Sequence, residues 1–111
     1  MSLEAVSEAR IEKADGSQFQ VHGAMTFEHA KVLLQQSEKL FVALPEIEID
    51  LSQVEKADSA GLALMLEWMA WAAERETKVS FIGVPEAILS IAHLCQIESL
   101  LDGYIAHPSQ V

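Results

Sequence analysis

Apolar and acidic residues alternate from residue 47 to residue 51, where the chain reads I-E-I-D-L. A period of two residues is typical of a β-strand that buries one face and leaves the other in water. The mostly polar residues 52–56 that follow are predicted to form a turn. From Leu62 to about Glu76 the apolar positions instead recur at helical spacing. The pattern therefore predicts a core strand, a turn and a helix in direct succession.

Asp58 and Ser59 stand at the start of this predicted helix. Short polar side chains are favoured there, because their oxygens accept hydrogen bonds from backbone N–H groups that the first helical turn leaves unpaired. The Ser59 hydroxyl is therefore expected at the exposed amino end of the helix, just past the core strand. Of all positions in the chain, this one is best suited to chemistry or recognition.

The segments before the core strand follow the same two periods. Residues 9–13 and 17–22 are predicted to be short strands joined around Asp15-Gly16, a dipeptide that favours a hairpin turn. Thr26 can cap a helix over residues 27–40, whose apolar residues recur on one side.

The carboxy-terminal third continues the alternation of strands and helices. Residues 78–82 are predicted to be a strand ended by Gly83, and Pro85 suits the first turn of a helix because its missing N–H would be unpaired there. This third helix is expected to run to about residue 95. The side chains that it is expected to bury are Ile88, Ile91, Ala92 and Cys95. A partial helix over residues 96–101 and a last strand over residues 104–106 complete the prediction.

Strands that alternate with helices predict an α/β fold, in which helices pack against a mixed sheet. Residues 1–111 are expected to form a single domain, because this length is close to the commonest domain size and no linker or repeat interrupts it. Residues 1–7 are expected to be a flexible amino-terminal end.

The helix after Ser59 carries large apolar residues in several directions. At 100° per residue, one side groups the residues predicted to pack on the sheet: Leu62, Met65, Leu66, Met69 and Ala73. Leu64 and Trp71 point roughly the opposite way and Trp68 lies on the flank, with Glu67 on the outward side. Because Trp side chains dominate the energetics of many interfaces, we predict a partner-binding patch of Leu64, Glu67, Trp68 and Trp71. The alternative is that the third helix or the carboxy-terminal segment covers these residues.

Charge narrows the class of partner. The formal net charge is −10 and the pI is near 4.6, so phosphate backbones and anionic lipid surfaces are repelled. No apolar run reaches the roughly 18 residues that cross a bilayer, and no signal-peptide pattern opens the chain. The single cysteine, Cys95, allows no intrachain disulfide and fits a reducing cytoplasm. We expect a cytoplasmic protein that binds another protein, with no nucleic acid and no membrane insertion.

Catalytic and metal-binding patterns are missing from the sequence. The four histidines, His22, His29, His93 and His107, show no metal-ligand spacing with one another or with Cys95. No nucleophile elbow, Walker A loop or dinucleotide-binding glycine pattern is present. Asp58 beside Ser59 does not make a catalytic pair, since a base within hydrogen-bond reach is needed. The expectation is a non-enzyme without metal or cofactor.

The order Asp50-Leu51, a short connection, then Asp58-Ser59-Ala60-Gly61-Leu62 resembles the STAS family, the sulfate-transporter and anti-sigma-factor-antagonist domains. The resemblance covers roughly residues 19–101 and implies a STAS-type mixed sheet of four to five strands with helices packed against it. In anti-sigma-factor antagonists of this family the hydroxyl after the Asp is phosphorylated. That position corresponds to Ser59, supported by Asp58, Ala60 and Gly61. Two other interpretations of Ser59 stay open: a helix cap that is never phosphorylated, and a hydroxyl contact to a protein partner.

Residues 58–66, which read D-S-A-G-L-A-L-M-L, are most similar to the MlaB-type STAS subunits of phospholipid-transport ABC systems. This resemblance implies a small cytoplasmic protein that binds and regulates the transporter's ATPase, with Ser59 and the following helix against that ATPase. It would be peripheral to the inner membrane through its partner. The alternative is an anti-sigma-factor antagonist controlled by phosphorylation of Ser59 through a kinase-type anti-sigma factor. A ligand- or nucleotide-binding STAS domain is a third class, without support in the sequence.

Overall fold

A mixed four-stranded sheet and four helices make up the described part of the chain. The computed structural model describes residues 8–42 and 44–106; the amino-terminal end expected over residues 1–7 lies outside them. In chain order the elements are β1 (Arg10–Asp15), β2 (Gln18–Met25), α1 (Ala30–Leu40), β3 (Glu46–Ala57), α2 (Ser59–Glu74), β4 (Lys78–Ile82), α3 (Glu86–Leu94) and α4 (Glu98–Asp102).

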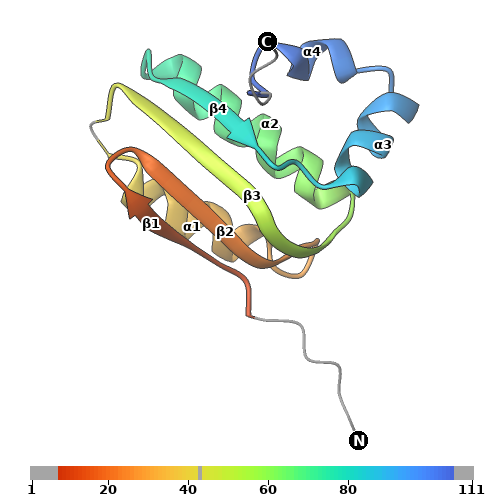
Figure 1. Cartoon of the computed structure of the whole chain (residues 1–111), viewed down its shortest axis with the longest axis horizontal. Helices are drawn as coiled ribbons and strands as arrows, with labels where there is room; N and C mark the ends of the chain where they lie inside the picture. Colours follow the sequence, from red (N-terminus) through yellow and green to blue (C-terminus); the bar gives the residue numbers. More distant parts are fainter. Residues whose placement is uncertain (1–7, 43, 107–111) are drawn as a thin grey trace, which may run out of the picture.

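The strands are ordered β1-β2-β3-β4 in the sheet. β1 pairs with β2 antiparallel through the predicted hairpin, whereas β2–β3 and β3–β4 are parallel. Figure 1 shows α1 and α2 together on one face of the sheet, with α3 and α4 near its β4 edge. The predicted α/β fold with a mixed sheet of four to five strands is confirmed.

β3 is the central strand and is longer than the sequence pattern predicts. Ile47, Ile49 and Leu51 are buried as expected from their alternation. The predicted turn over residues 52–56 is wrong, because β3 continues to Ala57 and this second half pairs with residues 22–25 of β2. Pairing of backbone groups does not depend on apolar side chains, so a polar segment can extend a strand when a neighbouring strand is available.

The first helix begins later than predicted. Residues 26–29 form a turn in which the Thr26 carbonyl accepts hydrogen bonds from the N–H groups of His29 and Ala30, both at 2.9 Å. α1 therefore starts at Ala30 instead of Phe27. The consequence is that the Phe27 side chain points away from the core and is 83% exposed.

The third helix and the end of the chain also depart from the prediction in part. β4 and α3 occupy the predicted ranges, but Cys95 is exposed instead of buried, because it follows the last residue of α3 and no longer shares its inner face. The predicted last strand is reduced to one parallel bridge between Ile105 and Phe81. None of the helices in the described residues is long and apolar enough to cross a membrane.

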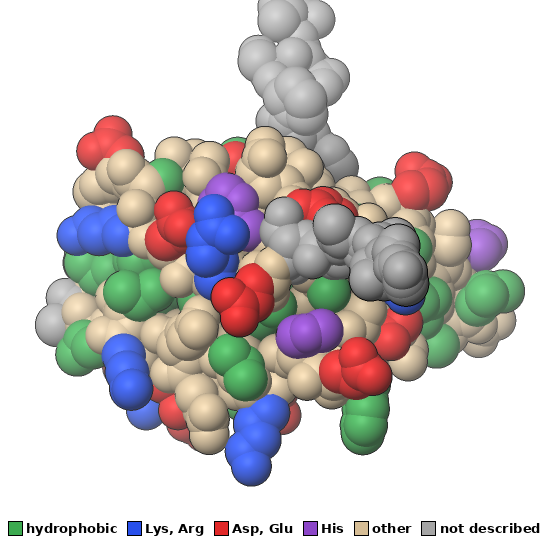
Figure 2. Space-filling view, turned by 90° about the horizontal axis from the view of Figure 1, so that it is seen from below, with side chains coloured by type: hydrophobic (Ala, Val, Ile, Leu, Met, Phe, Trp, Pro, Cys, Tyr) green, Lys and Arg blue, Asp and Glu red, His purple; other side chains and the backbone are tan. Residues whose placement is uncertain are grey.

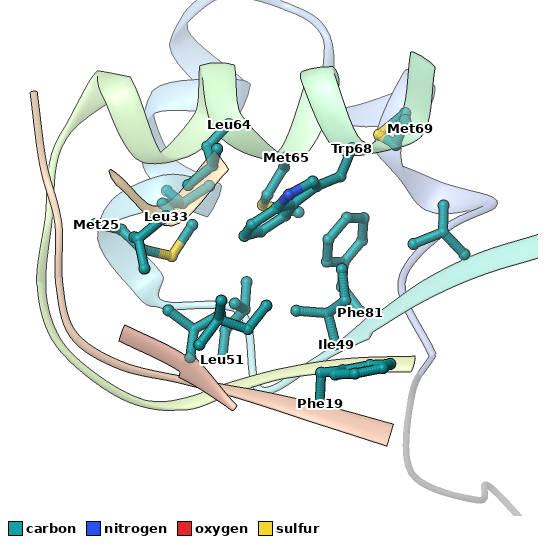
Figure 3. Packing of buried hydrophobic residues seen from close by; sticks show 14 of the residues in the cluster. Phe19, Met25, Leu33, Ile49, Leu51, Leu64, Met65, Trp68, Met69 and Phe81 are labelled. Atoms are coloured by element: carbon teal, nitrogen blue, oxygen red, sulfur yellow. The ribbon is translucent and has the colours of Figure 1, made fainter. Parts of the chain in front are cut away.

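The core lies between the sheet and α2, and it includes residues predicted to be on the surface. Leu64 and Trp68 are only 3% and 1% exposed, and Figure 3 shows both among the packed side chains. The Trp68 indole N–H donates a 2.8 Å hydrogen bond to the Ser37 hydroxyl of α1, and its ring stacks on Phe81 of β4. The prediction that Leu64 and Trp68 are exposed is therefore wrong. Helix α1 covers the side of α2 on which Trp68 lies.

The burial of two other residues of α2 also differs from the prediction. Trp71 is half-buried, and the centroid of its ring lies 5.6 Å from that of Phe41. The Arg75 guanidinium lies 4.5 Å from the centroid of the Trp71 ring. Ala73, predicted to face the sheet, is exposed. A helix with neighbours on several sides buries more than one stripe, so a division of α2 into one buried and one exposed side does not apply.

Candidate functional site

The carboxyl end of β3 leads directly into α2, and Ser59 is the first residue of that helix. Ser59 is exposed, as predicted. Its hydroxyl forms no hydrogen bond within residues 8–42 and 44–106, so it can meet another molecule without breaking an internal bond. The positive end of the helix dipole lies at the same place, which favours negative charge there.

Asp58, and not Ser59, caps this helix. The Asp58 backbone is extended, with φ −135° and ψ −163°, and its Oδ1 accepts a 2.8 Å hydrogen bond from the Ala60 N–H. This is the usual geometry of an N-cap carboxylate. The interpretation of Ser59 as the helix cap is therefore wrong.

The second carboxylate oxygen of Asp58 contacts a different part of the chain. Oδ2 accepts a 3.3 Å hydrogen bond from the N–H of Phe27, in the turn between β2 and α1. The Asp58 N–H in turn donates to the carbonyl of Met25, also at 3.3 Å. One residue thus ties the end of β2 and the Phe27 turn to the start of α2.

Gly61 allows α2 to approach β2 and α3 closely. A Cβ atom at this position would lie 3.0 Å from the Met25 carbonyl oxygen and 3.0 Å from Cδ1 of Ile88. A larger residue would push the first turn of the helix outward. The position of Ser59 is therefore fixed by its neighbours in the chain. Asp58 and Ala60 contribute the hydrogen bond between them, and Gly61 contributes the close approach that its small size allows.

The exposed side of α2 continues from Ser59. Its members recur at helical spacing and are mostly small: Ser59, Ala63, Glu67, Ala70, Ala73 and Glu74. Of the four residues predicted to contact a partner, only Glu67 lies on this stripe. Trp71 is half-buried at its side, whereas Leu64 and Trp68 are in the core.

The histidines do not form a cluster. His29 lies in the turn between β2 and α1, where its Nδ1 is 3.2 Å from the Thr26 hydroxyl oxygen. His93 Nδ1 lies 2.6 Å from Oε2 of Glu98, and this hydrogen bond is the main reason that the pKa of Glu98 is lowered. His22 Nε2 is buried without a hydrogen-bond partner among the described residues, and His107 lies outside them. Within the described ranges, no group of three or more His, Cys, Asp or Glu side chains could hold a metal ion.

A hollow on the described surface lies away from Ser59. It has a volume of about 720 Å³ and is lined by residues at the amino ends of β3 and β4, among them Glu46 and Lys78, together with Tyr104 from the segment after α4. Ser59 follows the carboxyl end of β3, so the hollow and the hydroxyl are at opposite ends of that strand. We therefore place the candidate site at Ser59 and not in this hollow.

Sequence reasoning missed Phe27, because the residue was assigned to the first turn of a helix. Phe27 is brought to the site by its hydrogen bond to Asp58, which lies 31 residues further along the chain. No local sequence pattern predicts a contact over such a separation. The one signal in the sequence is Thr26, which was predicted as a helix cap and so indicates that a helix begins near this segment.

Comparisons with known proteins concern the family and the fold. Residues 9–102 match the family model described as "Mlab, STAS domain". A sulfate transporter family protein from Wolinella succinogenes is similar in structure, with a TM-score of 0.62 and 14% sequence identity over 80% of this chain and 74% of that one.

The anti-sigma factor antagonist SpoIIAA in its unphosphorylated form is also similar. Its TM-score is 0.66 at 11% identity, over 93% of this chain and 90% of that chain. At such identities these two likenesses concern the fold. No curated protein sequence matches the chain significantly. Because the family model spans the whole sheet and the Asp58–Gly61 segment, the chain belongs to the MlaB-type STAS domain family.

Proposed function

We propose that this protein is a non-catalytic regulatory subunit that binds and regulates the ATPase of a phospholipid-transport ABC system. The observation that carries this proposal is the match of residues 9–102 to the MlaB-type family model. The protein would be cytoplasmic and held at the inner membrane through its partner. No cofactor enters the proposal.

The geometry at the start of α2 supports a binding function. Ser59 and Glu67 lie on one exposed stripe whose other members are small, so the backbone of a partner can approach closely. The Ser59 hydroxyl can donate one hydrogen bond and accept up to two. With Leu64 and Trp68 in the core, the contact surface consists of Ser59, Glu67 and the exposed edge of Trp71.

A second candidate function is an anti-sigma-factor antagonist controlled by phosphorylation of Ser59. The observation that favours it is the exposed hydroxyl without an internal hydrogen bond, among the described residues, at the amino end of a 16-residue helix. A phosphate there would add close to two negative charges to a binding surface, enough to break an interface. In this case Ser59→Asp abolishes binding to a kinase-type anti-sigma factor.

The test is affinity purification of the tagged protein from its native cells, with mass identification of its partners and of any phosphate on Ser59. Recovery of an ABC ATPase together with unmodified Ser59 is the result we expect. Recovery of a soluble kinase-like protein with phosphate on Ser59 would replace the first proposal by the second.

A further inference from the structure

Phe27 is the most exposed large apolar residue among those described, at 83%. Single exposed apolar residues are common on protein surfaces and need no explanation by themselves. Phe27 differs because its backbone is held in place. Its N–H donates to Asp58, and the adjoining Thr26 carbonyl accepts two further hydrogen bonds from His29 and Ala30.

The Asp58 carboxylate connects the backbone of the Phe27 turn to the Ser59 site. One oxygen accepts from Ala60 at the start of α2 and the other from Phe27, so both segments depend on the same side chain. A turn whose backbone is held before binding loses less conformational entropy when the residue that it carries enters a pocket. The Phe27 turn is therefore preorganised for contact beside Ser59.

The charge around the ring indicates what it contacts. Glu28 is exposed next to Phe27, and Asp58 lies across the turn. Neither carboxylate forms an ion pair with any described residue, although the charges of Glu12, Glu74 and Glu98 are paired with nearby basic groups or histidines. An exposed apolar ring next to Glu28, on a protein with a net charge of −10, fits an apolar recess that carries Lys or Arg at its rim.

We propose that Phe27 is an apolar anchor of the partner-binding surface, inserted into a recess with a basic rim and held in position by Asp58. This inference rests on the proposed function, since it takes the partner to be the ATPase that contacts Ser59. It adds a residue from a different segment to that contact and gives Asp58 a positioning role besides its role as helix cap.

The first experiment measures the affinity of the co-purified ATPase for single variants. We expect Phe27→Ala to weaken binding roughly 10- to 100-fold, as for a buried aromatic anchor. Leu94→Ala is the matched control, because Leu94 on α3 is 79% exposed; we expect its effect to be less than about twofold. Affinity of the unaltered protein should also fall as salt is raised. Equal affinities of the Phe27→Ala and Leu94→Ala variants would overturn the anchor, and affinity independent of salt would overturn the basic rim.

Asp58→Asn separates the two roles of this side chain. An amide has one oxygen, so it can still cap α2 but cannot also accept from Phe27. We expect a small fall in the thermal midpoint from the lost hydrogen bond, faster hydrogen exchange of the Phe27 amide, and weaker binding. Asp58→Asn with unchanged exchange and unchanged affinity would refute the positioning role.

A photo-cross-linking amino acid at position 27, with position 94 as control, distinguishes failure of this inference from failure of the proposed function. Cross-linking of the ATPase from position 27 alone supports both. An ATPase that binds but cross-links from neither position refutes the anchor and leaves the proposed function intact. If a different, identified protein cross-links from position 27 and loses affinity with Phe27→Ala, the anchor stands and the ATPase is the wrong partner. No cross-link from position 27 to any protein overturns the anchor.

Discussion

At the scale of single residues, Gly61 determines how closely α2 approaches its neighbours. The backbone oxygen of Met25 and the end of the Ile88 side chain lie 3.0 Å from the point that a Cβ atom would occupy. Ile88 can turn aside, but a backbone carbonyl that belongs to the end of β2 cannot. The absence of a side chain at residue 61 is therefore a condition for the geometry of Asp58 and Ser59.

We predict that Gly61→Ala destabilises the protein by about 1–3 kcal/mol, as overpacking does in other cores, despite the better helix propensity of Ala. Urea unfolding followed by circular dichroism measures the change. Gly103→Ala is the control, because a Cβ there has no neighbour within 4 Å and φ is −74°; its stability should be nearly unchanged. Equal stability of the two variants would contradict the close-contact argument.

At the scale of secondary-structure elements, Trp68 links α2 both to the neighbouring helix α1 and to the sheet. Its indole N–H donates to Ser37, whose hydroxyl donates in turn to the Leu34 carbonyl at 2.7 Å. Both Trp68 and Ser37 are almost fully buried. This polar link inside an apolar cluster fixes the relative position of the two helices.

We predict that Trp68→Phe lowers the free energy of unfolding by roughly 2 kcal/mol, from a lost hydrogen bond and a smaller ring in a packed site. Trp71→Phe, at a half-buried site, should cost roughly 1 kcal/mol or less. Chemical denaturation compares the two variants. At a temperature where each is folded, Trp68→Phe should leave partner affinity unchanged, and a large loss of affinity would restore Trp68 as a contact residue.

A second link between elements joins α3 to α4 and depends on pH. The hydrogen bond from His93 lowers the pKa of Glu98 below its ordinary value of 4.5. Because the unfolded chain then binds a proton more readily than the folded one, this contribution to stability is present above about pH 4.5 and is lost as the pH falls through the lowered pKa.

We therefore predict that Glu98→Gln is less stable than the unaltered protein near pH 6 and that the difference shrinks as the pH falls below 4.5. Thermal unfolding across this pH range tests it. Glu38→Gln, at an exposed position of α1 without an ion pair among the described residues, is the control. A stability difference between Glu98→Gln and the unaltered protein that is the same at every pH would refute the role of the carboxylate's charge.

At the scale of the whole molecule, the net charge of −10 governs which surfaces the protein approaches. The face shown in Figure 2 carries acidic and basic side chains interspersed, with apolar residues between them. Repulsion from anionic surfaces is thus a property of the total charge and not of one acidic patch on this face.

We predict that the isolated protein does not sediment with vesicles rich in phosphatidylglycerol at about 0.15 M salt, since anionic headgroups repel it. Vesicles that also carry the reconstituted ATPase should retain it. Retention by the lipid alone would contradict attachment through a protein partner.

Local patterns predicted most of the strands and helices, because each depends on neighbours in the chain. The alternation in residues 47–51, the Asp15-Gly16 turn and the Gly83-Pro85 boundary all correspond to the observed elements. The Asp58-Ser59 segment was likewise placed at an exposed helix start. Three features could not be predicted in this way: the extension of β3 to Ala57, the exposure of Phe27, and the burial of Trp68. Each depends on a contact with a segment 20 or more residues away.

By itself, the sequence determined the class of fold, the exposed hydroxyl of Ser59 and the acidic character of the surface, because periodicity, capping preference and charge are encoded locally. Only the tertiary structure decided which side of α2 is free. Leu64 and Trp68 lie in the core, where Trp68 is bonded to α1, and Asp58 brings Phe27 beside the start of α2. Burial depends on what packs against a residue, and a helical period reports only the direction in which a side chain points.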